Sequence, residues 1–326
     1  MKTTRRKLLM GLGLGFPMLA AGMGKAWAYP DRPIKIVVPY PTGSSLEVIA
    51  RVVAESYLGE LGSPAIVFNM PGGSAAIGTR SVAQSAPDGY TLLLGTNQTH
   101  GANSALYPKL GYDPVQDFIP IAGLGRLQHL LVARKDLGVD TLDAFVELVR
   151  SRSGDINYGS SGNGSASHLA AEMFKRSAGV DMQHIPYKGS GDVVQAIMGG
   201  HIDAAFSTMP TVLAQVRNGD LIALAVASAT RSPSLPDIPT LTEKGILNAE
   251  ADAWSALFAP KGTPPQVIEK LAATTLKTFS DPAVIQRIAA TGFIPEITPQ
   301  QAFREFLLKD MQNWADIIRD ANITVD

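Results

Sequence analysis

A loop rich in serine and glycine stands directly before a helical pattern in NYGSSGNGSASHLAAEMFKR, residues 157–176. Such a loop can hold a nucleophilic serine, a phosphate or another anion, because free backbone N–H groups at a helix N-terminus bind negative charge. The residues of this loop that could take part are Ser160, Ser161, Gly162, Asn163, Gly164 and Ser165. Motifs elsewhere in the chain must decide between these chemistries.

The sequence lacks the motifs of the common catalytic and phosphate-binding loops. A nucleophile elbow needs GxSxG, and the serines near His168 do not form that pattern. Neither GxxxxGKS nor GxxxxGKT occurs, nor a strand-linked GxGxxG with a downstream acidic residue. The five histidines show no HExxH or other close ligand spacing. We therefore expect no catalytic residue, no metal and no cofactor, and a hydrolase is the weakest of the alternatives.

A second loop of the same kind follows the apolar run IKIVVPY. The residues PTGSS precede LEVIARVVAESYLGEL, which has the apolar spacing of a helix, and Ser44 and Glu47 have the spacing of a capping box. Each helix N-terminus carries about half a positive charge. A carboxylate between two such loops would receive several charge-assisted hydrogen bonds. Since ligands of open α/β sheets bind beyond the carboxyl ends of strands, we expect the two loops to face one another across a cleft.

Strand and helix patterns alternate along the chain and predict an α/β fold. The same order of elements recurs along the chain: a strand, a loop of small residues and then a helix. This order is typical of mostly parallel sheets that are covered on both faces. We expect one lobe from residues 29–127 and 250–326 and a second from residues 128–249, joined by two crossing segments. The tail holds a single strand and two helices, too little for a third domain, so it should return to the first lobe.

The first 28 residues have the features of a secretory signal peptide, either of the ordinary type or, with Arg5 and Arg6, of the twin-arginine type. They carry five basic and no acidic side chains, an apolar run from Leu8, and Ala26-Trp27-Ala28 before Tyr29. With these residues removed, Lys and Arg together fall from 28 to 23 while Asp and Glu stay at 29, so the net charge becomes −6. Nucleic acid is therefore not an expected partner. The absence of cysteine excludes a disulfide framework, and we expect a periplasmic protein cleaved before Tyr29.

Six ordered blocks of sequence carry a family resemblance. They include YPDRPIKIVVPYPTGSSLEVIAR, NMPGGSAAIGTRSVAQSAPDGYTLLLGT, ALYPKLGYDPVQDFIPIA, LIALAVASATRSPSLPDIPTLTEKG and WSALFAPKGTP, as well as the block around NYGSSGNGS. With these blocks the sequence resembles the substrate-binding proteins of tripartite tricarboxylate transporters, the Bug receptors. The resemblance implies a monomeric two-lobe periplasmic binding protein of type II, a Venus flytrap without catalysis. It also implies a small organic acid as ligand and membrane permease subunits as partners.

The resemblance also implies which residues line the site. Besides the loop 160–165, the expected ligand contacts are Tyr40, Thr42, Gly43, Ser44, Ser45, Ser74, Ala75, Thr96, Asn97, Tyr187, Lys188 and Ser207. Many family members have Asp at the position of Ser207, where a carboxylate suits a ligand ammonium group. The neutral Ser207 predicts that amino acids are rejected and that the ligand is a dicarboxylate or an aromatic acid. A ligand-sensing module for a membrane sensor kinase is the alternative function, because it needs the same closed lobes.

Overall fold

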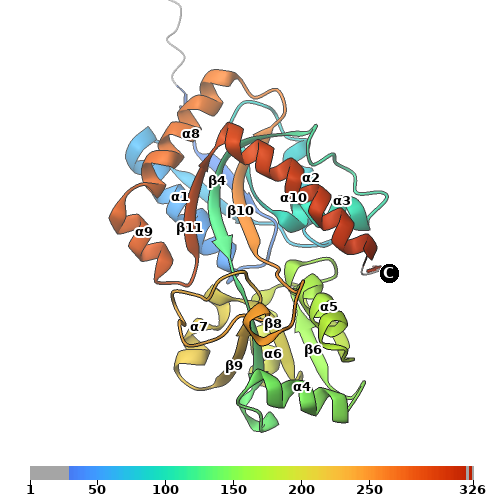
Figure 1. The fold of residues 1–326 in the computed structure, drawn as a ribbon. Helices are drawn as coiled ribbons and strands as arrows, with labels where there is room; N and C mark the ends of the chain where they lie inside the picture. Colours follow the sequence, from blue (N-terminus) through green and yellow to red (C-terminus); the bar gives the residue numbers. More distant parts are fainter. Residues whose placement is uncertain (1–28, 321–322, 325–326) are drawn as a thin grey trace, which may run out of the picture.

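The computed structural model describes residues 29–320 together with residues 323 and 324. The predicted signal peptide, residues 1–28, lies outside the described residues. The described chain forms two lobes, one above the other in Figure 1, and each lobe is a sheet with helices on its faces.

Lobe 1 is the part that carries a six-stranded sheet in the order β11-β4-β10-β3-β1-β2. Its strands are β1 (Ile34–Val38), β2 (Ala65–Asn69), β3 (Thr91–Thr96), β4 (Phe118–Leu127), β10 (Ala253–Pro260) and β11 (Ile294–Pro299). Its helices are α1 (Ser45–Leu61), α2 (Ala76–Ala83), α3 (Asn103–Leu106), α8 (Pro265–Phe279), α9 (Pro282–Ala289) and α10 (Gln300–Asp320), and a π-helical turn, η1, spans Gln98–Ala102. The strand β1 is parallel to both of its neighbours, and its apolar side chains are buried, as expected for a strand that is covered on both faces.

Lobe 2 carries a five-stranded sheet in the order β7-β6-β8-β5-β9. Its strands are β5 (His129–Arg134), β6 (Asn157–Ser160), β7 (Gln183–Pro186), β8 (Ala204–Thr208) and β9 (Leu221–Val226). Its helices are α4 (Leu142–Ser151), α5 (Ala166–Ala178), α6 (Ser190–Met198) and α7 (Met209–Arg217), with short 3-10 turns η2 (Lys135–Leu137) and η3 (Thr242–Lys244).

The sheets are mixed, so the expectation of mostly parallel sheets is wrong. Five of the nine strand pairs in the described part of the chain are antiparallel. The antiparallel pairs all involve β4, β10 or β5, the strands next to the crossings between the lobes. A strand that leaves a lobe and a strand that returns to it run in opposite directions, so each crossing adds antiparallel neighbours.

The two crossings lie side by side. One leads from β4 through Gln128 into β5, and the other leads back from β9 into β10. The amide of Gln128 donates to Ser228 Oγ at 3.1 Å and to the Thr230 carbonyl at 2.9 Å. An ion pair of 3.0 Å joins Arg126 to Asp252. At these crossings the chain passes from one sheet to the other. The lobe boundaries that we expect after residues 127 and 249 stay a prediction.

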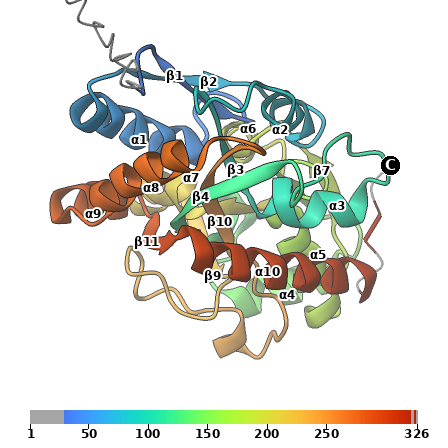
Figure 2. The same ribbon diagram turned by 90° about the horizontal axis from the view of Figure 1, so that it is seen from above.

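The long helix α10 belongs to lobe 1 by chain position and reaches toward lobe 2 with its C-terminal end (Figures 1 and 2). Its Trp314 and Ile318 are buried in one apolar cluster with Phe174 and Ala178 of α5. The Arg176 guanidinium of α5 donates to the carbonyl of Asp320. The lobes are therefore joined by side-chain packing as well as by the two crossings.

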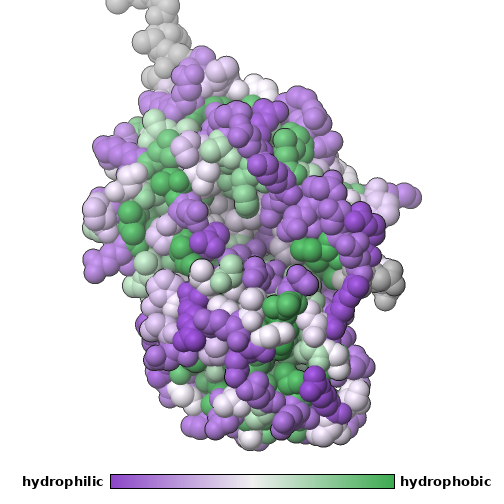
Figure 3. All heavy atoms as spheres, in the orientation of Figure 1, coloured by the Kyte–Doolittle hydropathy of each residue, from purple (hydrophilic) through white to green (hydrophobic). Residues whose placement is uncertain are grey.

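Among the described residues, no helix combines the length and the apolar character that a membrane span requires. Polar and apolar side chains are interspersed over the face shown in Figure 3. Single apolar side chains such as Phe306 and Leu308 of α10 are exposed, which is common on protein surfaces.

Candidate functional site

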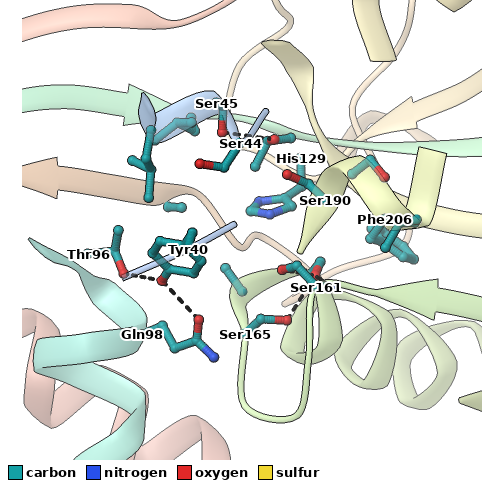
Figure 4. A pocket seen from close by; sticks show the side chains of 18 of the residues that line it. Tyr40, Ser44, Ser45, Thr96, Gln98, His129, Ser161, Ser165, Ser190 and Phe206 are labelled. Atoms are coloured by element: carbon teal, nitrogen blue, oxygen red, sulfur yellow. Dashed lines mark hydrogen bonds between the residues drawn. The ribbon is translucent and has the colours of Figure 1, made fainter. Parts of the chain in front are cut away.

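A cavity lies between the lobes at the ends of β1, β3, β6 and β8 and beside the crossings (Figure 4). It encloses about 560 Å³ of empty space, including the part that is open to solvent. The lining residues are Tyr40, Ser44, Ser45, Leu46, Thr96, Asn97, Gln98, Leu127, His129, Ser161, Ser165, Ala166, Ser167, Ser190, Val193, Phe206, Ser207, Thr208 and Ala253. None of these side chains is acidic, and none is a lysine or an arginine.

The N-terminus of α1 forms the lobe 1 side of the cavity. Ser44 is its N-cap residue, and its hydroxyl makes no capping bond. The predicted capping box is therefore wrong in part: Glu47 accepts a 2.7 Å bond from the N–H of Gly43, one residue before the N-cap, and pairs with Arg51. Ser45 reaches across to lobe 2, where its Oγ lies 3.3 Å from Thr208 Oγ1. The Ser44 hydroxyl is left free to face a ligand.

The N-termini of α5 and α6 form the lobe 2 side. Ser165 caps α5 by accepting from the N–H of His168 at 3.2 Å. Ser167 Oγ lies 3.0 Å from Ser161 Oγ and 2.9 Å from Ser165 Oγ, so the three hydroxyls form a connected group. Ser190 is the first residue of α6. Helix N-termini from both lobes thus converge on the cavity, and each contributes free N–H donors and a partial positive charge.

Three polar atoms in the lining have no hydrogen-bond partner within the described residues although they are buried. They are Ser44 Oγ, Asn97 Nδ2 and Ser207 Oγ. A buried polar group without a partner costs about 1–3 kcal/mol. A ligand or water in the cavity would remove that cost, because all three groups can donate a hydrogen bond to it.

Tyr40 is held by a small network at the lobe 1 wall. Its hydroxyl lies 2.8 Å from Thr96 Oγ1 and donates to Gln98 Oε1 at 2.9 Å. Burial raises the pKa of Tyr40 well above its usual range, and the bond to Thr96 opposes this effect only in part. The phenol is therefore neutral. Gln98 Nε2 donates in turn to the Asn163 carbonyl of lobe 2 at 3.4 Å, so the network reaches across the cleft.

His129 lies in the lining at the first residue of β5 and is 2% exposed. Its Nδ1 lies 2.8 Å from the carbonyl oxygen of Ala251, on the other crossing. Burial lowers the pKa of His129 to about 4, and the bond to Ala251 opposes this shift. The imidazole is neutral at neutral pH.

Eight of the predicted site residues line the cavity: Tyr40, Ser44, Ser45, Thr96, Asn97, Ser161, Ser165 and Ser207. Ten do not: Thr42, Gly43, Ser74, Ala75, Ser160, Gly162, Asn163, Gly164, Tyr187 and Lys188. Thr42, Gly43 and Lys188 are exposed to solvent. Direct contact of any of the lining residues with a ligand stays a prediction.

Residues of the second-lobe loop that miss the cavity shape its turn. Ser160 Oγ lies 2.6 Å from His184 Nε2, so it faces the interior of lobe 2. Gly164 has φ +73°, and a Cβ there would lie 2.3 Å from Leu106 Cδ1. Gly162 and Asn163 use their carbonyls to accept from the Ser165 N–H and from Gln98, respectively.

The remaining predicted residues outside the lining have partners within their own lobe. Ser74 Oγ lies 2.8 Å from the hydroxyl of Tyr107, and the carbonyl of Ala75 accepts from Thr79 Oγ1 at 2.8 Å. Tyr187 packs partly buried against an apolar cluster of lobe 2.

Lining residues that the sequence did not reveal come mostly from the crossings and from residues adjacent to predicted ones. They are Leu46, Gln98, Leu127, His129, Ala166, Ser167, Ser190, Val193, Phe206, Thr208 and Ala253. Ser190 had a usable signal, because KGSGD precedes a helical pattern in the same way as the two recognised loops. No local signal marks Leu127, His129 and Ala253, because pairing between strands far apart in the sequence and the contact of His129 with Ala251 bring them to the cavity.

Two α/β lobes joined by crossing strands, with helix N-termini directed into the cleft, define the class of periplasmic binding proteins. A family model described as tripartite tricarboxylate transporter family receptor matches residues 49–323. The chain belongs to this family of binding receptors, which includes the Bug proteins. BugT of Bordetella pertussis is 36% identical over 98% of this chain and 98% of its own length.

Two solved relatives contain bound dicarboxylates. The R. palustris protein Rpa4515 with adipate is 29% identical, with a TM-score of 0.88 over 91% of this chain and 99% of that one. MatC of Rhodopseudomonas palustris with bound malate is 32% identical, with a TM-score of 0.83 over 89% of this chain and 100% of that one.

Proposed function

We propose that this protein is a periplasmic receptor that captures a small organic carboxylate between its lobes and delivers it to the membrane subunits of a tripartite tricarboxylate-type transporter. The observation that carries the proposal is the convergence of the N-termini of α1, α5 and α6 on one cavity whose lining holds no acidic side chain. The carboxylates bound to the two R. palustris relatives support the same chemistry. The receptor performs no reaction on its ligand.

The cavity suits an acid with a carboxylate at each end. Helix N-termini on both lobes supply N–H donors, and a carboxylate accepts them in charge-assisted bonds. A ligand ammonium group would find no carboxylate among the lining side chains, and a buried unpaired cation is costly. Ser207, 2% exposed in this lining, is neutral. Acidic amino acids are therefore excluded from the proposed ligand class.

A thermal-shift panel tests the ligand class. The panel contains C4 to C8 dicarboxylates, aromatic acids and diacids, citrate, aspartate and glutamate. A ligand at 100 times its dissociation constant adds about 2.7 kcal/mol to the free energy of unfolding, a rise in Tm of roughly 5 °C for a chain of this size. We expect such a rise with at least one unaminated acid and none with aspartate or glutamate. A rise with the amino acids alone would refute the proposed class.

Export and oligomeric state are further parts of the proposal. Cleavage before Tyr29 would leave the first described residue as the mature N-terminus, and the intact mass of the exported protein tests it. A monomer is also part of the proposal, and light scattering after gel filtration tests it.

A further inference from the structure

We propose that His129 selects ligands that carry a hydroxyl group, by accepting a hydrogen bond from that hydroxyl at Nε2. This inference rests on the proposed function, since it assumes an organic acid in the cavity. The inference narrows the proposed ligand class: hydroxylated carboxylic acids are preferred to the corresponding acids without the hydroxyl.

The tautomer of His129 follows from its contact with the return crossing. The Ala251 carbonyl oxygen has no proton to give, so the 2.8 Å contact requires the proton to be on Nδ1. The ring is neutral because burial lowers its pKa to about 4. A neutral imidazole with a proton on Nδ1 carries a lone pair on Nε2. Nε2 makes no hydrogen bond with any described residue, and the ring lines the cavity (Figure 4).

The lone pair on Nε2 differs in chemistry from the rest of the lining. Every other polar side chain there is a serine, a threonine, a tyrosine, an asparagine or a glutamine, and each of these has at least one proton to donate. These groups and the helix N-termini suit carboxylate oxygens. Nε2 can only accept.

A carboxylate oxygen and a bare imidazole nitrogen repel one another, because both present lone pairs. A methylene group at the same place would leave Nε2 without a partner in a buried position. A ligand hydroxyl avoids both costs, since it donates to Nε2 and can also accept a hydrogen bond from a donor of the lining, such as the unpartnered hydroxyl of Ser44. Sites built to bond a hydroxyl discriminate strongly against analogues that lack it.

The ring is held by both crossings at once. His129 belongs to the outgoing crossing and Ala251 to the returning one. His129 also pairs with Thr208 in the lobe 2 sheet, so its backbone belongs to lobe 2 while its ring is tied to the return crossing.

Isothermal titration at pH 7.5 with matched acids tests the proposal. The pairs are succinate with malate, and glutarate with 2-hydroxyglutarate, each measured against the wild type, His129→Phe and His129→Gln. In the wild type, we expect the hydroxy acid to bind roughly tenfold to hundredfold more tightly than its partner. His129→Phe keeps a ring but removes the acceptor, so this preference should disappear while the affinity for the plain acid changes less than about threefold. His129→Gln retains an acceptor and should keep part of the preference.

The control is His201→Phe, the same change at an exposed histidine outside the cavity, which should keep the full preference. Equal binding of the two acids of each pair by the wild type would overturn the proposal. So would an equal loss for both acids in His129→Phe, or proton uptake on binding, detected as a heat that varies with the buffer, because a protonated ring has no acceptor. Failure of these four acids and of every acid in the thermal-shift panel to bind would overturn the proposed function as well, whereas binding without a hydroxyl preference overturns only the role of His129.

Discussion

At the scale of single residues, the site combines donors with almost no fixed charge. Ser44 Oγ, Asn97 Nδ2 and Ser207 Oγ are buried polar atoms with no partner in the described chain, and together they match the lone pairs of a carboxylate. Lys188, which the sequence placed at the site, is exposed and outside the lining. Recognition of an anion in this cavity would therefore depend on oriented dipoles and hydroxyls.

A substitution at Ser207 tests whether charge in the cavity decides which ligands bind. Ser207→Asp would put a carboxylate into the cavity, so we expect the affinity for the best dicarboxylate to fall at least tenfold, roughly the effect of one lost charge-assisted bond. The variant should gain measurable binding of aspartate or glutamate, whose ammonium group would then have a partner. Titration calorimetry measures both. The control is Ser207→Asn, which is similar in size to Asp and neutral. Equal behaviour of the two variants would contradict a role of charge at this position.

At the scale of elements, the sequence predicted the alternation of strands and helices and the two serine loops. Both predictions rest on local signals: the spacing of apolar residues, and small residues directly before a helix. The loop at Ser161 and Ser165 and the loop at Ser44 and Ser45 do line one cavity. The mixed sheets could not be predicted, since strand direction depends on which distant strand becomes the neighbour. His129 was missed for the same reason: its contact with Ala251 joins residues that are 122 positions apart.

The start of α1 offers a test of an element. Glu47 accepts from the Gly43 N–H at 2.7 Å and pairs with Arg51, near the positive end of the helix. We expect Glu47→Gln to lower the free energy of unfolding by about 1–2 kcal/mol, measured by urea unfolding. Glu55→Gln is the matched control, because Glu55 on the same helix pairs with Arg287 at the surface, where ion pairs contribute about 0–1 kcal/mol. Equal losses would show that the negative charge of Glu47 adds nothing at this helix N-terminus, because the amide oxygen of Gln can still accept from the Gly43 N–H.

At the scale of the whole molecule, the lobes are in contact across the cleft. Ser45 meets Thr208, and Gln98 meets the Asn163 carbonyl. These contacts belong to a closed arrangement. We expect the lobes to separate by motion about the crossings when a ligand enters or leaves. Binding energy would then be used in part to favour the closed state.

Small-angle scattering tests this closure. With saturating ligand the radius of gyration should fall below that of the ligand-free protein, because the ligand bridges the N-termini of both lobes. The double variant Ser45→Ala with Ser161→Ala should need more ligand for the same decrease than either single variant, since each lost hydrogen bond to a charged group costs about 1.5–3 kcal/mol. A radius that does not change with bound ligand would mean that the lobes do not move.

The end of α10 has a consequence for that motion. Two crossing strands alone would let the lobes rock through small angles against little resistance. Trp314 is 3% exposed and Ile318 6% exposed, in a cluster shared with α5, and this contact lies away from the crossings (Figure 1). Wide separation of the lobes would expose that apolar surface to water, so it would cost additional free energy. The residence time of a ligand would then be governed partly by side chains that never touch it.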